Sequence, residues 1–253
     1  MDLSATDHLL AALAALGAGL VNALAGGGTL LSFPALVALG VPAVRSNVTN
    51  TVALCPGYIG GTLSQRRELT GQRTRLRWLG AAAAAGGLTG SVLLVSTSEK
   101  LFRGVVPFLL LLACGLLLFQ DQIKRRLPPR SAHADARPSA GALVAIFASS
   151  VYGGYFGAGL GIVLLAMLGL LLDDVLPRLN ALKQGLSLVT NVVAAAFFAT
   201  SGEVVWSLVL VMAPASLAGG AIGGRLAGKI NPLVLRAVVV ICGLAVAVKL
   251  LLD

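Results

Sequence analysis

The sequence predicts an all-α, polytopic bundle of transmembrane helices, made of two inverted repeats with helices that are glycine-broken or re-entrant. Three observations lead to this prediction: 57% hydrophobic residues with only 11% charged ones, apolar runs of membrane-spanning length, and an internal similarity at a fixed spacing. A water-soluble core cannot bury so much apolar surface. The composition is therefore that of an integral membrane protein.

Seven apolar runs are long enough to cross a bilayer, since a transmembrane helix needs about 20 apolar residues. They occupy residues 9–25, 47–64, 78–96, 102–119, 180–200, 204–223 and 233–252. Three shorter apolar pieces lie near residues 29–41, 140–156 and 160–172, next to the glycine-rich segments 26–28 and 157–161. Short apolar pieces beside glycine are typical of discontinuous helices, which exist at membrane depth only where protein or a cavity surrounds them.

A polar, proline-containing stretch divides the chain almost in half. We predict a first transmembrane repeat over residues 1–119, a cytoplasmic linker over 120–139 and a second repeat over 140–253. Adding 133 to a position in the first repeat often reaches the same residue in the second, without a gap. Because the matches include arginine and asparagine as well as glycine, the spacing indicates a duplicated unit.

Basic residues predict the orientation of the repeats, because cytoplasmic loops are enriched in Lys and Arg. Basic residues cluster at 66–77, in the linker and at 225–236, whereas the segments around residues 2–7, 99–100 and 203 are weakly basic or acidic. The first repeat then begins outside and ends inside, and the second does the reverse. Inverted repeats with broken helices are typical of secondary transporters, whose substrate site lies near the membrane midplane.

Several functions are disfavoured by what the predicted spans lack. Both histidines lie outside them and no Cys, His, Asp or Glu cluster has metal-ligand spacing, so we expect no metal, no cofactor and no enzyme activity. No acidic residue lies in the middle of a span, which argues against cation transport and against a carboxylate proton relay. The net charge of +9 lies in short loops and indicates topology and contact with anionic lipid rather than nucleic acid.

Two polar stripes at the starts of equivalent helices form the predicted substrate site. Each stripe has helical spacing and therefore shares one helix face. The side chains are Asn47, Asn50, Thr51 and Tyr58 in the first repeat and Asn180, Lys183, Gln184, Ser187 and Asn191 in the second. Amide, hydroxyl and ammonium donors across a pseudo-two-fold axis suit an oxyanion. Hydrogen bonds that only hold the helices together, or a lysine that snorkels to the headgroups, would give the same pattern.

Glycines at the two breaks are predicted to contribute backbone donors to this site. A break can end one half-helix and open another, whose first N–H groups favour an anion. The residues are Gly26, Gly27, Gly28, Gly159 and Gly161. Arg45 and Arg178 precede the striped helices on opposite sides of the membrane and are predicted to attract anions to the two mouths. Ordinary interfacial anchors would occupy the same positions.

Small residues four apart predict close helix packing elsewhere in the bundle. Gly86 with Gly90 and Gly219 with Gly223 form such pairs at the 133-residue spacing. Small-xxx-small pairs let the backbones of two helices approach closely inside a membrane.

The first glycine segment carries a resemblance to a known family. Residues 25–36 read AGGGTLLSFPAL and are followed by LGVP at 39–42 and NVTN at 47–50. This pattern resembles the TauE/SafE family of sulfite exporters, and with the duplication, the central loop and the chain length the resemblance covers essentially the whole sequence. The second copy begins GAGLG at 157–161 and departs from the pattern, because Leu160 replaces the middle glycine and Met167 stands where Pro34 stands. We therefore expect unequal contributions from the two halves.

The resemblance implies export of sulfite or a small sulfur-containing organic anion across the bacterial cytoplasmic (inner) membrane. The predicted partners are a small anionic substrate and membrane lipid, and a homo-oligomer is also compatible with the sequence. We expect alternating access between the halves, driven either by membrane potential alone or by protons carried as bisulfite. The alternative hypothesis is a membrane scaffold or assembly subunit whose polar stripes only hold helices together.

Overall fold

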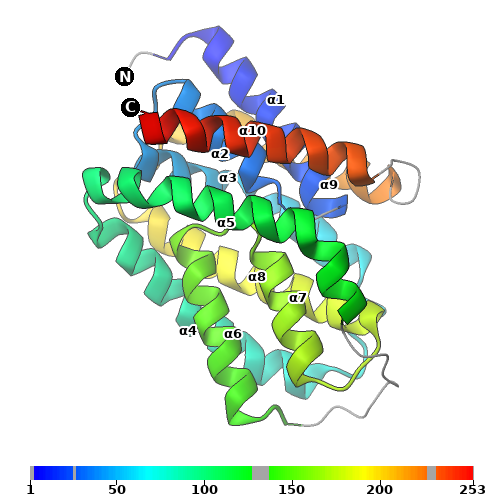
Figure 1. Ribbon diagram of the computed structural model, residues 1–253. Coiled ribbons are helices and arrows are strands. Elements are labelled where there is room, and N and C mark those ends of the chain that lie inside the picture. Colours follow the sequence, from blue (N-terminus) through cyan, green and yellow to red (C-terminus); the bar gives the residue numbers. More distant parts are fainter. Residues whose placement is uncertain (1–2, 25–26, 127–136, 227–231, 253) are drawn as a thin grey trace.

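A computed structural model describes residues 3–24, 27–126, 137–226 and 232–252, and its regular elements are helices (Figure 1). No strand occurs in the described residues, which confirms the all-α prediction. The helices in chain order are α1 (Ala5–Leu24), α2 (Thr29–Ala38), α3 (Ala43–Ser64), α4 (Arg73–Ser96), α5 (Glu99–Arg126), α6 (Ala140–Tyr155), α7 (Leu160–Leu171), α8 (Leu176–Ala199), α9 (Trp206–Leu226) and α10 (Pro232–Leu252).

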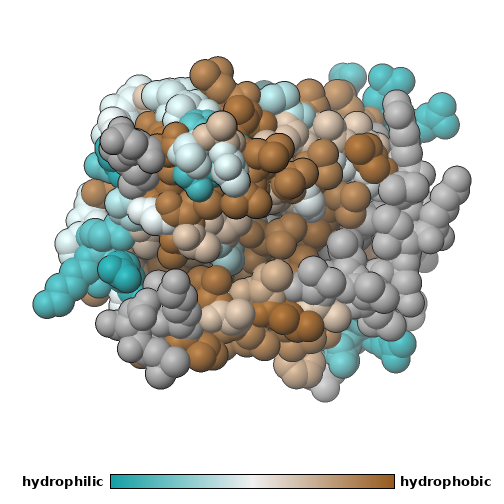
Figure 2. Space-filling view, turned by 90° about the horizontal axis from the view of Figure 1, so that it is seen from above, coloured by the Kyte–Doolittle hydropathy of each residue, from teal (hydrophilic) through white to brown (hydrophobic). Residues whose placement is uncertain are grey.

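Five helices of the described chain are long and apolar enough to cross a membrane, namely α1, α4, α5, α8 and α9. Helix α3 has 22 residues but carries Asn47, Asn50 and other polar side chains, and it falls outside this group. Large apolar side chains are exposed on the spans, such as Phe108 at 63% and Leu210 at 74%. Figure 2 shows hydrophobic residues across the middle of one face and hydrophilic ones towards its two ends. This surface is suited to lipid, and the protein is a multi-pass membrane protein.

Helices α2 and α7 are too short to cross the bilayer. They have 10 and 12 residues, and at about 1.5 Å per residue each spans roughly half of a hydrocarbon core of about 30 Å. Each follows a break in the chain, after α1 and after α6. Gly157 and Gly159 have φ angles of 77° and 76° in the second break, a left-handed conformation that favours glycine. The predicted glycine-broken helices are therefore present.

The helices repeat at the same spacing as the residues. Helices α8, α9 and α10 begin 133 residues after α3, α4 and α5. The packing also repeats: α1 lies along α9, and its counterpart α6 lies along α4. Each half therefore completes its packing with a helix from the other half.

Equivalent helices run in opposite directions where they touch. Helices α5 and α10 lie side by side, and in Figure 1 α5 runs from left to right while α10 runs from right to left. Thr62 Oγ1 near the end of α3 donates to the Gln184 carbonyl at 3.3 Å. Asn180 Nδ2 donates to Gln65 Oε1 at 2.8 Å. Later residues of the α3 segment thus meet earlier residues of α8, so this pair is antiparallel as well.

Glycines allow the close approach of the paired helices, as the small-xxx-small pattern predicts. A Cβ atom on Gly90 of α4 would lie 2.0 Å from the Val151 carbonyl oxygen of α6. On Gly219 of α9 it would lie 2.0 Å from the Leu16 carbonyl oxygen of α1. Real Cβ atoms do not approach a carbonyl so closely, so a larger residue would force the helices apart.

Helix α5 is longer than the sequence suggests, because it continues to Arg126. Residues 120–126, predicted as the start of the linker, are helical. Residues 127–136 of the predicted linker lie outside the described residues. Helix α6 then begins at Ala140. Ser139 is its N-cap residue, and Ser139 Oγ accepts a hydrogen bond from the Ala142 amide at 3.2 Å.

Replacing Gly90 by alanine is expected to destabilise the protein by about 1–3 kcal/mol, because the added methyl would overlap the Val151 carbonyl. Gly80 lies in the same helix with nothing within 4 Å of an added Cβ, so Gly80→Ala is the matched control. That control should keep or raise stability through its better helix propensity. The midpoint of thermal unfolding in detergent compares the two variants. Equal midpoints would mean that Gly90 does not set the α4–α6 spacing.

Candidate functional site

A small pocket lies where the two helix breaks meet α3 and α8. Both short helices contribute their first residues, and α1, α3 and α8 complete the wall. The lining residues are Asn22, Gly27, Thr29, Tyr58, Gly157, Gly159, Leu160, Gly161, Lys183, Gln184 and Ser187. The structure thus brings together seven of the predicted substrate-binding residues, which are Gly27, Tyr58, Gly159, Gly161, Lys183, Gln184 and Ser187.

Lys183 lies beside the first turn of α7. A Cβ atom on Gly161 would be 3.6 Å from Lys183 Cδ and 3.8 Å from its Nζ atom, so the absence of a side chain leaves the ammonium group close to the helix start. The N-terminus of a helix carries about half a positive charge. The starts of α2 and α7 and the ammonium group therefore make the pocket electropositive.

Hydroxyl and amide groups also line the pocket. Ser187 Oγ is buried and has no hydrogen-bond partner among the described residues. Asn191 lies one turn further along α8, and its Nδ2 donates to the Ser187 carbonyl at 2.8 Å. The Tyr58 hydroxyl lies within hydrogen-bonding reach of Asn22 and Asn191. Ser187 thus offers an unused donor to a solute in the pocket.

Four predicted residues lie away from the pocket lining, and three of them make other hydrogen bonds. Asn47 Nδ2 donates to the Tyr155 carbonyl at 2.8 Å, and Thr51 Oγ1 donates to the Asn47 carbonyl at 2.9 Å. Asn180 bonds Gln65, as described above. Asn50 is buried, and its Oδ1 atom has no partner among the described residues. Of the predicted glycines, Gly28 is the N-cap residue directly before α2, and Gly26 lies outside the described residues.

The two predicted mouth arginines form ion pairs at opposite ends of α8. Arg45 Nε lies 3.0 Å from Glu203 Oε2, and both side chains are about two-fifths exposed, at 42% and 39%. Arg178 Nε lies 3.0 Å from Asp174 Oδ1, and Arg178 Nη1 donates to the Thr70 carbonyl at 3.1 Å. Each guanidinium thus has an anionic partner in the protein.

Asn22 is a pocket residue that the sequence analysis does not include. Its Oδ1 atom accepts a hydrogen bond from the Gly28 amide at 2.9 Å, which satisfies a backbone group just before α2. A Cβ atom on Gly28 would lie 2.1 Å from the Ala18 carbonyl oxygen, so Gly28 lies directly against the backbone of α1. The sequence does contain a signal for this role, because Asn22 is a polar residue near the end of an apolar run and close to a glycine break.

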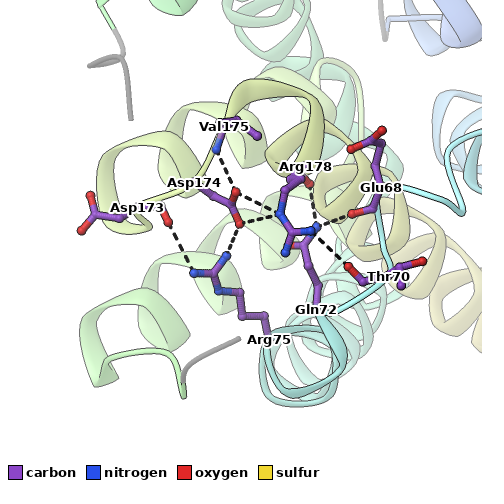
Figure 3. A network of polar contacts seen from close by, with 8 residues as sticks. All are labelled: Glu68, Thr70, Gln72, Arg75, Asp173, Asp174, Val175 and Arg178. Atoms are coloured by element: carbon purple, nitrogen blue, oxygen red, sulfur yellow. Dashed lines mark hydrogen bonds and ion pairs between the residues drawn. The ribbon is translucent and has the colours of Figure 1, made fainter. Parts of the chain in front are cut away.

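A buried charged network near the start of α8 is also absent from the sequence analysis (Figure 3). Arg75 Nη1 of α4 lies 2.5 Å from Asp174 Oδ2, and the two side chains are 4% and 0% exposed. Gln72 Nε2 donates to the Arg178 carbonyl at 3.1 Å and to the Glu68 carbonyl at 2.8 Å. Asp174 Oδ1 also accepts the Val175 amide at 2.8 Å, directly before α8. The network joins the first repeat to the second.

Within the described residues, no group of three or more His, Cys, Asp or Glu side chains is placed to hold a metal ion. Cys55, Cys114 and Cys242 are free thiols. The pocket lining itself offers hydrogen-bonding groups and the positive charge of Lys183.

Comparisons with known proteins agree with a membrane transporter. The family model described as "Sulfite exporter TauE/SafE" matches residues 11–250. A "Probable membrane transporter protein ORF9" from Sinorhizobium sp is 29% identical over 97% of this chain and 94% of its own length. A "Probable membrane transporter protein" from Haemophilus influenzae is 27% identical over 97% and 95% of the two chains. The "Probable membrane transporter protein YfcA" of Escherichia coli K12 is 27% identical over 93% and 86%. No solved structure gives a significant match.

Replacing Asn22 by alanine is expected to lower the free energy of unfolding by about 1–3 kcal/mol, because the buried Gly28 amide loses its acceptor. Thr89→Ala is a suitable control, since the exposed Thr89 hydroxyl bonds the Ala85 carbonyl of its own helix. Chemical unfolding in detergent micelles measures both variants. If Asn22→Ala is as stable as the control, the hydrogen bond does not hold the start of α2.

Proposed function

This chain belongs to the sulfite exporter TauE/SafE family and is a membrane transporter, and we propose that it exports a small oxyanion such as sulfite or an organosulfonate. The family match spans residues 11–250, and the relatives named above are described as probable membrane transporter proteins, not as enzymes. The proposed location is the bacterial cytoplasmic membrane, with the arginine-rich segment 66–77 on the cytoplasmic side.

The observation that carries the anion proposal is the convergence of three positive groups on one pocket. The first residues of α2 and α7 line it, and so does Lys183. Helix N-termini are ready anion sites, and broken helices in secondary transporters direct them at anionic groups of the substrate. Positive groups gathered in a medium of low dielectric constant attract a negative charge strongly. A small anion is therefore the solute that complements this pocket best.

Neutral donors around the pocket suit an oxyanion in particular. Several oxygen atoms of sulfite or a sulfonate can each accept a hydrogen bond. The Ser187 hydroxyl is buried without a partner in the described chain, and the side chains of Asn22 and Thr29 also line the pocket. Each donor that reaches an anionic oxygen forms a charge-assisted bond, which is stronger than a bond between neutral groups.

Alternating access between inverted repeats is the proposed mechanism. The antiparallel contacts of α5 with α10 and of α3 with α8 support the inversion, because these helices are equivalent in the 133-residue repeat. The pocket has walls from both halves, so relative movement of the halves would expose it first to one side and then to the other. Moving one negative charge outward through about 100 mV yields about 2.3 kcal/mol, which is enough to drive efflux without a carboxylate relay.

Replacing Lys183 by glutamine tests this proposal. The variant is expected to weaken sulfite binding about tenfold or more, because a charge-assisted hydrogen bond is lost from the pocket. Sulfite efflux from loaded proteoliposomes, measured over a range of concentrations, gives the change in KM. Lys183→Arg keeps the charge and should retain part of the flux.

Lys100→Gln is the matched control, because Lys100 is exposed and the variant loses the same charge away from the pocket lining. Its flux should equal that of the parent protein. If Lys183→Gln keeps full flux and loses only stability, the polar stripe is structural and the anion proposal is wrong.

A further inference from the structure

The charged network of Arg75, Asp174 and Arg178 lies to one side of the pocket. Arg178 comes five residues before Lys183 on α8, which is about 7.5 Å along the helix at 1.5 Å per residue. On either side of Lys183 in α8, Asn180 donates a hydrogen bond to Gln65 and the Gln184 carbonyl accepts one from Thr62. Thr62 and Gln65 lie at the end of the α3 segment. Along α8 from Lys183, the Asn180 contact thus comes first, and the charged network follows beside Thr70 and Gln72 of the 66–77 segment.

The opposite end of the molecule has apolar residues at the equivalent positions. The residues 133 positions from Asp174 and Arg75 are Val41 and Leu208, and they are 2% and 0% exposed. Arg45, the counterpart of Arg178, pairs with Glu203 instead, and that ion pair is partly exposed. The start of α8 thus has a buried carboxylate between two guanidinium groups, whereas the start of α3 has Val41 and Leu208 at the equivalent positions and binds the Glu99 carboxylate through the Ala43 and Val44 amides.

Packing alone does not require ions at this position. Replacing a buried ion pair by apolar residues of similar volume is often neutral or stabilising, because the ions lose their hydration. The chain itself has the apolar solution at Val41 and Leu208. The carboxylate of Asp174 also binds the Val175 amide at the start of α8, as Glu99 binds amides at the start of α3. That role needs no guanidinium partner, so the two arginines call for a further reason.

We propose that this network is the gate between the pocket and the side of the 66–77 segment, and that Asp174 closes it by occupying the guanidinium groups that a passing oxyanion would bind. Carboxylates and oxyanions both present oxygen atoms that a guanidinium binds through parallel N–H groups. An incoming anion can take the place of the Asp174 carboxylate on Arg75 and Arg178. Each arginine then always has an anionic partner, either Asp174 or the solute. This inference rests on the proposed transport of an anion.

Replacing the charged network by the residues found at the equivalent positions near the start of α3 tests whether an anion exchanges with Asp174. Thr70→Glu, Arg75→Leu and Asp174→Val together copy the arrangement of Glu203, Leu208 and Val41, since Thr70 is the counterpart of Glu203. The triple variant is expected to unfold at the same temperature as the parent or higher, whereas sulfite flux falls about tenfold or more because the gate no longer exchanges with an anion. A folded triple variant with unchanged flux would overturn the proposal.

Accessibility of the pocket tests the gate without any substrate. In a background in which Cys55, Cys114 and Cys242 are replaced by alanine, Ser187→Cys places one thiol in the pocket lining. Adding Asp174→Asn removes the anionic partner at nearly constant size. Labelling by a membrane-impermeant thiol reagent from the 66–77 side should then be severalfold faster.

Glu203→Gln is the control, because it breaks the partly exposed pair at the other end and should leave labelling from the 66–77 side unchanged. Vesicles of the two orientations separate the two sides. Equal labelling rates with Asp174 and with Asn at position 174 would refute the gate. This outcome does not depend on whether the triple variant folds. A parent protein that moves no sulfite would instead refute the proposed substrate and leave the labelling result standing.

Discussion

Broken helices inside a membrane impose the main constraint on this molecule. Their freed backbone groups find no water in the hydrocarbon, so they must face protein or a polar cavity. Asn22 binds the Gly28 amide at one break, and the glycines at 157 and 159 turn the chain at the other. Both breaks open on the same pocket, and Tyr58 of α3 and the polar face of α8 line it. The position of the candidate site is thus a consequence of satisfying the backbone.

Some features of the structure can be predicted from patterns in the sequence, and others depend on how the helices pack. The lengths of apolar runs and the 133-residue spacing predict the helices, the breaks and the face that holds Lys183 and Ser187. Helical spacing does not say which neighbour a face meets, so Asn47 and Asn180 lie on the predicted stripes but bond Tyr155 and Gln65. Arg75 and Asp174 are 99 residues apart, and only the packing of the two halves brings them together.

At some positions 133 residues apart, a charged residue in one half has an uncharged counterpart in the other. Lys183 has Asn50 as its counterpart, and Asp174 has Val41. These charged residues occur in one copy only, so the two halves contribute unequally to the pocket and to its surroundings.

The exchange of partners between the halves has an evolutionary consequence. Helix α1 packs along α9 and α4 along α6, with glycine at the contacts. A chain with only one repeat would leave these glycine-lined surfaces without a matching helix. Such an ancestor would be complete only as an antiparallel pair of identical subunits, and fusion of two gene copies would have joined that pair into a single polypeptide.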